Sequence, residues 1–286
     1  MNNKLKLNNL KITRLVFIVL MLSSCQDRSS HKFDNYNLNE KSNIKIKLPK
    51  ELSEISGLAY SEDNHIVTNN DETGTVFEID ILTGKILNEF YLGKKKIKKD
   101  FEGIAAVNDS LFMVTSSGVL YQFSFPDEEQ NVEYKKYKTF LSSKYDVEGL
   151  CFDRATNSLL LACKGFAGKD LKGYKAIFKF DLSNHKLAEE PRFLISLKKL
   201  KDKYDIKNFS PSGIEIHPRS GNFFIVSANI KAIIEISPDG KILEAVKLDK
   251  KYHKQPEGIT ILPDGSLIIA DEGNGGKGFI TIIKEN

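Results

Sequence analysis

Apolar and polar residues alternate with a period of two along most of the chain from residue 43 onward. The alternation comes in short stretches bounded by Gly, Asn, Asp or Pro, such as residues 213–217 (GIEIH), 233–236 (IIEI) and 279–282 (FITI). This pattern is typical of short β-strands joined by tight turns. Because the units repeat without helical segments between them, the pattern predicts an all-β fold.

A short signature divides these strands into five similar units. In each unit Ser or Glu precedes Gly, and Leu or Ile follows it: Ser56-Gly57-Leu58, Glu102-Gly103-Ile104, Glu148-Gly149-Leu150, Ser212-Gly213-Ile214 and Glu257-Gly258-Ile259. Successive glycines are 46, 46, 64 and 45 residues apart. Four antiparallel strands in about 45 residues are typical of a β-propeller blade. We therefore predict a propeller of five four-stranded blades.

The long third interval leaves one alternative open. It contains a lysine-rich stretch near residues 196–209, which we interpret as an insertion in one loop. If this interval instead hides a degenerate blade, the propeller has six blades. A β-sandwich would explain neither the even spacing nor the repeated glycine.

The last unit contains three strands rather than four, and a candidate for the missing strand lies upstream of the first unit. Residues 43–48 (NIKIKL) alternate as a strand does. We expect them to pair beside residues 279–284 and close the ring, which would cover an exposed sheet edge. The predicted propeller domain therefore covers residues 43–286.

The N-terminal region has the features of an export signal. The first 14 residues carry four basic and no acidic side chains, and residues 15–22 (LVFIVLML) are all apolar. This run is shorter than the roughly 20 residues needed to span a bilayer, but it suits the apolar core of a signal peptide. Leu22-Ser23-Ser24-Cys25 follows with the pattern of a bacterial lipobox. The alternative is an ordinary signal peptide followed by a chance cysteine.

These features predict a lipoprotein outside the cytoplasm. Residues 1–24 are the expected signal peptide, Cys25 the lipidated residue, and residues 25–42 a polar, flexible tether. We expect the protein to be a monomer that is held at the cell membrane or envelope by its lipid. Its partner is then an unknown ligand or envelope protein.

Net charge argues against a nucleic-acid partner. The chain has 42 basic and 38 acidic residues, and removing the four bases of the signal peptide leaves 38 of each. Nucleic-acid binding needs a concentrated basic footprint, which this balance does not provide. We interpret the lysine runs at residues 94–99 and 198–203 as solvated loops, with contact to acidic lipids or polyanions as the alternative.

The two cysteines of the domain are expected to be free and buried. If residues 154–157 form a turn, Asp153 pairs with Ser158 and Cys151 falls opposite Leu160. Cys163 then lies on the other face of the sheet. A disulfide needs converging side chains with Cα atoms within about 7 Å.

Polar residues are predicted to surround one end of the propeller axis. In a blade, the entry of the first strand and the exit of the second lie at the same end, near the axis. The candidate binding residues at the exits are Asn70, Asp71, Glu72, Lys164, Asn229, Asp271 and Glu272. The entries contribute Glu102, Glu148 and Glu257, together with Ser56 and Ser212.

The three entry glutamates are the candidate metal ligands. Oxygen donors that converge on one funnel suit a divalent cation such as Ca²⁺, or a polar ligand held by hydrogen bonds. Because three neighbouring carboxylates repel one another, either a cation or Lys164 is expected among them. The alternative is that each glutamate only accepts hydrogen bonds from the backbone at its strand entry.

The chain resembles the SdiA-regulated, YjiK-like lipoprotein family. The resemblance covers nearly all of residues 45–286 and is carried by residues 52–86, 208–229 and 255–273. NHL and gluconolactonase-like propellers share only looser fragments of these segments. The resemblance implies a β-propeller lipoprotein and assigns it no activity.

A more distant similarity is to gluconolactonase-type propellers, which hold a divalent cation that polarises a lactone. Glu257, Asn229 and Asp271 match that pattern loosely, but Ser56 stands where that family has a glutamate. The sequence lacks the G-x-S-x-G, H-E-x-x-H and C-x-x-C motifs. We therefore predict a binding or scaffolding module, with a metal-dependent hydrolase of lactones, esters or phosphoesters as the alternative.

Overall fold

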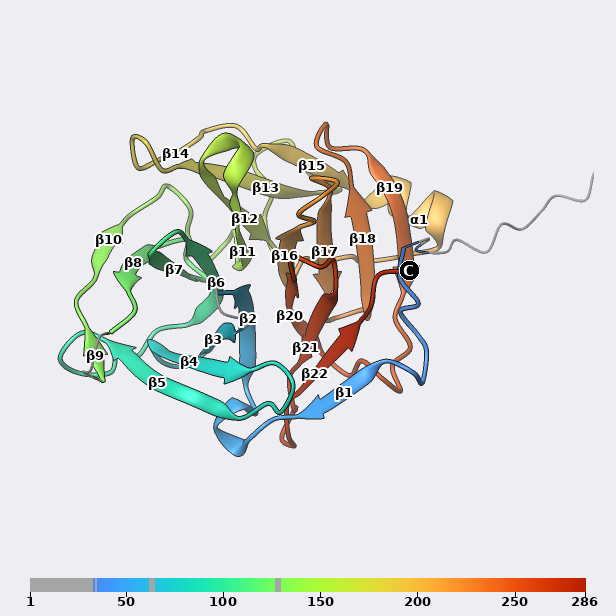
Figure 1. Cartoon of the computed structure of the whole chain (residues 1–286). Coiled ribbons are helices and arrows are strands. Elements are labelled where there is room, and N and C mark those ends of the chain that lie inside the picture. The colour runs from blue at the N-terminus through green and yellow to red at the C-terminus, as the bar shows by residue number, and fades with distance from the viewer. Residues whose placement is uncertain (1–32, 34, 62–64, 127–129) are drawn as a thin grey trace, which may run out of the picture. The chain divides into compact units, whose positions relative to one another are not determined.

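The computed structural model describes residues 33, 35–61, 65–126 and 130–286. In this part of the chain, five sheets are arranged in a ring as the blades of a β-propeller (Figure 1). The predicted fold class and the count of five are confirmed. The predicted signal peptide and Cys25 lie outside the described residues.

The first two blades follow the predicted strand order. The first contains β2 (Ile55–Tyr60), β3 (His65–Asn70), β4 (Thr75–Asp80) and β5 (Ile86–Leu92). The second contains β6 (Phe101–Val107), β7 (Ser110–Thr115), β8 (Leu120–Ser124) and β10 (Lys135–Tyr137). Between β8 and β10, the short β9 (Asn131–Val132) joins the edge of the first blade by pairing parallel to β5.

The third and fourth blades are also built from consecutive strands. The third contains β11 (Val147–Asp153), β12 (Ser158–Cys163), β13 (Tyr174–Asp181), β14 (Lys186–Leu187) and β15 (Phe193–Ser196), of which the last two both pair with β13. The fourth contains β16 (Gly213–Ile216), β17 (Phe223–Ser227), β18 (Ala232–Ile236) and β19 (Ile242–Lys247).

The fifth blade joins the two ends of the domain. It contains β20 (Pro256–Ile261), β21 (Leu267–Asp271) and β22 (Phe279–Ile283), and its outer strand is β1 (Ile44–Lys47). In the observed register Ile44 lies opposite Ile282 and Lys47 lies opposite Phe279. This confirms the predicted closure of the ring by the upstream strand.

The hydrophobic core lies between the blades. Among the described residues, the buried apolar side chains form five clusters, and each cluster joins the facing sides of two neighbouring blades. Strands with apolar residues on both faces, such as 159–162 and 223–226, lie in the middle of a blade and contribute to the clusters on either side of it.

The five signature glycines lie where neighbouring inner strands come closest. A Cβ atom at Gly57 would lie 2.6 Å from the backbone nitrogen of Ile104, and one at Gly103 would lie 2.8 Å from that of Leu150. Real Cβ atoms do not make such short contacts, so these positions require glycine because of close backbone approach. The repeat read from the sequence therefore has a steric cause.

The hairpin of the third blade has the predicted register. A 3-10 turn, Arg154–Thr156, joins the two strands, Cys151 lies opposite Leu160, and Asp153 lies opposite Ser158. Cys151 and Cys163 are free and buried, and they belong to core clusters on opposite sides of the blade. The expected free thiols are confirmed.

The sequence analysis predicted a loop for the lysine-rich insertion, but part of it is helical. Helix α1 (Leu197–Tyr204) follows β15, and the Ser196 side chain accepts a hydrogen bond from Lys199 N at its N-terminus. Leu200 and Tyr204 are buried in the core cluster between the third and fourth blades. The lysines therefore form the solvated side of a short amphipathic helix.

The segment predicted as a tether packs on the domain from Phe33 onward. Phe33, Tyr36 and Leu38 are buried in the core cluster between the fourth and fifth blades, where both aromatic rings contact Phe224. The Tyr36 hydroxyl also donates to Gly265 O at 2.7 Å. The polar composition of residues 26–42 hid these three anchoring residues.

None of the helices in the described residues is long and apolar enough to cross a membrane.

We expect Gly57→Ala to lower the free energy of unfolding by about 1–3 kcal/mol, because the new methyl group overlaps the next inner strand. Denaturant unfolding followed by circular dichroism measures this loss. Gly74→Ala is the matched control, since a Cβ there would have its nearest neighbours at 3.4 Å, an ordinary contact. Equal losses in the two variants would contradict the steric role of the signature.

Candidate functional site

The channel along the propeller axis contains two hollows separated by a narrow waist. At the waist the signature glycines leave a void of only about 10 Å³. One hollow, called here the funnel, lies at the end where the inner strands begin and has a volume of about 270 Å³. Its wall is formed by Lys164, Ser210, Ser212, Ala228, Asn229, Lys231, Gln255 and Glu257.

A β-bulge recurs just before the waist. In four blades the ladder between the first two strands shifts by one residue in the Ser-Gly or Glu-Gly signature. The shift takes Glu102, Glu148 and Glu257 out of register. Because bulges re-aim side chains and recur near functional sites, this local geometry explains why the entry residues gather at the mouth of the channel.

Lys164 is the cation among the three entry glutamates. Its Nζ atom donates to Glu148 Oε1 at 2.9 Å, and the Glu148 side chain is only 8% exposed. Burial lowers the pKa of Lys164, but the charge and hydrogen bond of Glu148, together with the charges of Asp146 and Glu257, outweigh this effect and leave the pKa raised. Of the two partners expected for the glutamates, a divalent cation or Lys164, the structure places the ammonium group of Lys164 beside Glu148.

Burial and mutual repulsion raise the pKa values of the glutamates. Burial raises the pKa of Glu148 to about 7, although Lys164 opposes the shift. Burial, the charge of Glu148 and the neighbouring Asp100 raise the pKa of Glu102 to about 10. Glu102 is therefore a neutral acid near pH 7, while Glu148 is close to its titration midpoint.

Gln255 joins Glu257 to a second acidic group. Its Nε2 atom donates to Glu257 Oε1 at 3.1 Å and also to Glu272 Oε2. Burial raises the pKa of Glu257. Burial and the hydrogen-bonded Glu54 raise the pKa of Glu272 to about 8. Two of the predicted residues, Glu257 and Glu272, are thus held by an amide that the sequence analysis did not single out.

Asp271 is buried and supports the loop before the inner strand. Its Oδ2 atom lies 2.9 Å from His253 Nδ1, and its Oδ1 atom accepts from the Gln255 backbone at 3.1 Å. Both side chains are almost fully buried. Asp271 therefore positions the segment that carries Gln255, and its two oxygens are already engaged.

The other predicted exit residues have mixed roles. Asn70 accepts from the Glu72 backbone at 2.9 Å, and Glu72 itself is exposed. The pKa of Asp71 is raised by burial and by Glu54, and its Oδ1 atom is buried without a hydrogen-bond partner. Asn229 lies on the funnel wall, where it bonds Ser227 and the Asn208 carbonyl.

Side chains at the entries also join one blade to the next. Ser56 donates to Glu102 O at 2.6 Å, and Ser212 donates to Pro256 O at 2.7 Å. Asn69 donates to Phe101 O at 2.8 Å. In the two blades that have serine at the entry, the serine therefore has a structural role. The entry glutamates differ, because none of the hydrogen bonds found among the described residues joins one of them to a backbone N–H.

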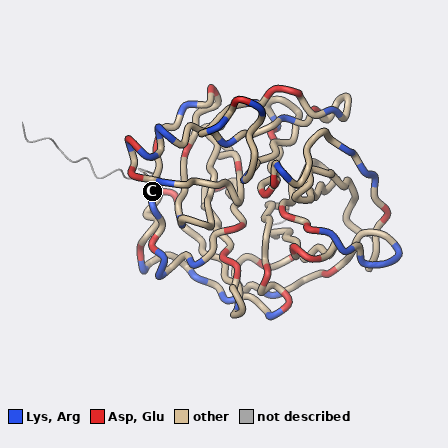
Figure 2. Tube along the Cα trace, turned by 180° about the vertical axis from the view of Figure 1, so that it is seen from behind, with Lys and Arg blue, Asp and Glu red and all other residues tan. Residues whose placement is uncertain are grey.

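The acidic side chains do not converge as a metal site would. Across residues 33–286, apart from the few that are not described, no group of three or more His, Cys, Asp or Glu residues is arranged to hold a metal ion. Lysine and arginine positions are spread mainly around the periphery, while several acidic positions lie near the middle of the ring (Figure 2). Lys164, through its ion pair with Glu148, neutralises part of this acidity.

Comparison with known proteins identifies both family and fold. The family model described as SdiA-regulated matches residues 34–275. The glutaminyl cyclase of Myxococcus xanthus is similar in structure, with a TM-score of 0.55 and 14% sequence identity over 85% of this chain and 95% of that chain. A luciferin-regenerating enzyme has a TM-score of 0.53 and 11% identity over the same shares. At these identities the likeness is one of fold alone, and no curated protein matches the sequence.

Glu102→Gln should make the domain more stable above neutral pH. The pKa of Glu102 is about 10 in the folded chain against an ordinary 4.5, so the folded state holds a proton that the unfolded state releases. Its contribution is complete below about pH 4.5 and is lost as the pH rises toward 10. At pH 8 we expect a gain on the order of 1–3 kcal/mol from the variant, and none at pH 4.

Denaturant unfolding at the two pH values measures this difference. Glu51→Gln, at an exposed site, is the control and should change little at either pH. A loss of stability at pH 8 in Glu102→Gln would show that the carboxylate is needed in its ionised form.

Proposed function

The chain belongs to the SdiA-regulated family, and we propose that it is a lipid-anchored binding protein of the cell envelope. Its β-propeller binds a small anionic, hydroxyl-rich ligand, such as an acidic or phosphorylated sugar, in the funnel. The protein acts as a monomer outside the cytoplasm. A lipid on Cys25 attaches it to the membrane.

The composition of the funnel wall carries the proposal. Two lysines, Lys164 and Lys231, share a hollow of about 270 Å³ with Gln255, Glu257 and Asn229. Ammonium groups suit a carboxylate or phosphate, while amide and carboxylate oxygens accept from hydroxyl groups. The volume is just below the range of about 300–1,000 Å³ typical of ligand pockets, which favours a ligand of about one sugar ring.

A metal-dependent hydrolase of lactones, esters or phosphoesters is the second candidate. The observation that favours it is the pairing of a neutral acid, Glu102, with a partly ionised one, Glu148, since such pairs serve as general acid and base. A divalent cation such as Ca²⁺ at Glu102, Glu148 and Glu257 would have to displace the Lys164 ammonium.

We expect full-length protein in detergent to bind glucuronate and glucose 6-phosphate, and to bind glucose at least tenfold more weakly. Isothermal titration calorimetry measures the affinities. Lys231→Ala should weaken binding of both anions about tenfold, because it removes one ammonium group from the wall. Lys241→Ala, at an exposed lysine outside the funnel wall, is the control.

Two results would oppose the binding proposal. Equal affinity for glucose and its anionic forms would remove the role of the lysines, and no binding of any of the three would remove the ligand class. Ca²⁺-dependent ester or lactone hydrolysis that disappears in Glu257→Gln would instead support the hydrolase.

Lipid attachment has its own test. In bacterial cells fed an alkyne-tagged palmitate, we expect the chain to be labelled and to sediment with membranes. Cys25→Ser should lose both properties, because only a thiol at the lipobox can be modified. Cys151→Ser, which changes a buried thiol, should keep them. Full labelling of Cys25→Ser would rule out this anchor.

A further inference from the structure

The second hollow of the channel lies beyond the glycine waist, at the end opposite the funnel. Its volume is about 580 Å³, and its wall is formed mainly by apolar side chains from the inner strands of the blades. Ala105, Cys151, Phe152, Ile216 and Ile261 are among them. The waist, with its void of about 10 Å³, separates this cavity from the funnel.

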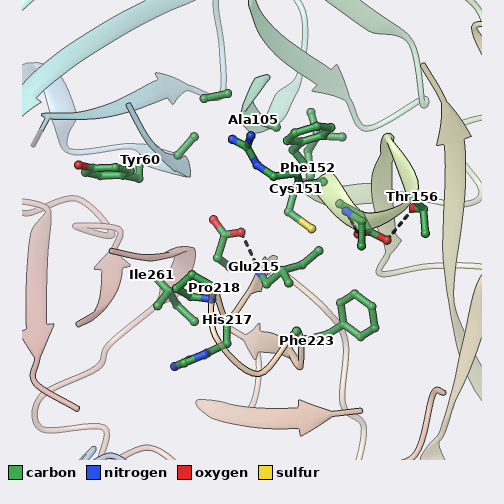
Figure 3. A pocket seen from close by; sticks show the side chains of 18 of the residues that line it. Tyr60, Ala105, Cys151, Phe152, Thr156, Glu215, His217, Pro218, Phe223 and Ile261 are labelled. Carbon is green, nitrogen blue, oxygen red and sulfur yellow. Dashed lines mark hydrogen bonds between the residues drawn. The ribbon is translucent and has the colours of Figure 1, made fainter. Parts of the chain in front are cut away.

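A carboxyl group on an inner strand interrupts the apolar part of the wall. Glu215 on β16 lies two residues after its signature glycine, where the other inner strands have Ala59, Ala105, Cys151 and Thr260. Figure 3 shows its carboxylate extending into the cavity on the side of Cys151, which comes from β11. A small residue would fill this position in a purely structural wall, as it does in the other four blades.

The carboxylate of Glu215 has only neutral partners. Its Oε1 atom accepts from the Ile216 backbone at 2.8 Å, and its Oε2 atom accepts from the Thr260 hydroxyl at 3.1 Å. Among the described residues, no lysine, arginine or histidine forms an ion pair with it. Since a carboxylate has about four acceptor positions, further donors can be accommodated.

Two arginines lie elsewhere on the same wall. Arg192 donates to the Pro238 carbonyl at 2.9 Å, and the Arg154 guanidinium lies 5.9 Å from the centre of the Phe152 ring. Neither forms an ion pair with an acid among the residues that the structure describes. The cavity wall thus combines apolar surface with the Glu215 carboxyl group and two guanidinium groups.

We propose that this cavity binds a short apolar peptide, with the N-terminal ammonium on Glu215 and the C-terminal carboxylate toward Arg154 and Arg192. A half-buried carboxylate without an ion pair is costly among apolar side chains, and a ligand ammonium group would compensate its charge. The apolar side chains of the peptide would cover the alanine, isoleucine and phenylalanine surface. A cavity of about 580 Å³ is within the range of sites for small ligands.

The pKa values of the groups on the cavity wall agree with this orientation of the peptide. Burial raises the pKa of Glu215 to about 7, and burial together with the Glu215 charge raises that of the Cys151 thiol, which stays neutral. His217 has a lowered pKa because of burial and Arg219. Asp153 at the start of the 3-10 turn and Tyr60 complete the titratable groups of the wall, with the two arginines. Glu215 is therefore the group expected to change its charge near neutrality.

Titration calorimetry with the full-length chain in detergent tests the proposal, with dileucine as the probe. N-acetyl-dileucine lacks the ammonium, and dileucine amide lacks the carboxylate, so each should bind at least tenfold more weakly than dileucine. The affinity for dileucine should rise several-fold from pH 6 to pH 7.5, as Glu215 ionises while most of the peptide amine is still charged.

Variants assign each end of the peptide. In Glu215→Gln the preference for dileucine over its acetylated form should disappear, a ratio that a general loss of folding would not change. Arg154→Gln with Arg192→Gln should remove the preference over the amide. Lys164→Gln, in the funnel, should leave both preferences intact, which separates this site from the proposed funnel ligand.

Three results would overturn the proposal: no binding of dileucine at millimolar concentration, equal binding of the acetylated peptide, or an unchanged preference in Glu215→Gln.

Discussion

The close approach of five inner strands around one axis is the constraint on which the molecule depends. Each strand comes so near the next that a single methyl group at the contact would overlap backbone atoms, as at Gly57 and Gly103. Glycine at this point lets the blades converge, so that apolar clusters pack tightly between neighbouring blades. The glycines recur in the sequence because each blade contributes one of these contacts to the ring.

The same convergence creates the electrostatic problem of the funnel. Residues just before the glycines come from different blades, so that the charge of Glu148 acts on Glu102 and the charge of Glu257 acts on Glu148, while burial disfavours the ionised form of all three. The protein responds partly with a proton, on Glu102, and partly with an ammonium group, from Lys164. Both responses leave the funnel less negative than its composition indicates.

Features that depend on period and spacing were predictable from the sequence. The blade count, the closing strand at residues 44–47 and the pairing of Cys151 with Leu160 all follow from alternation and turn residues. A cation or Lys164 was expected beside the glutamates, and Lys164 contacts Glu148, because propeller geometry brings strand entries and exits to the same end.

Features that depend on a single side chain's partner were not predictable. Helix α1 rests on two buried residues in a lysine-rich segment, too short a pattern to recognise. Asp271 was expected to face the ligand, but it is turned to His253, 18 residues away, and that histidine had no local signal. Glu215 was also missed. Only an alignment of the five inner strands on their glycines shows that it is a charged residue where the other strands have small ones.

The closing strand has a mechanical consequence. A pull on the N-terminus reaches the domain through Phe33, Tyr36 and Leu38 before it reaches β1, and these side chains are buried between the last two blades. Their aromatic rings would carry the first part of the load, so that the hydrogen bonds between β1 and β22 are shielded from it. The ring can therefore remain closed under a tension that would separate an unsupported edge strand from its sheet.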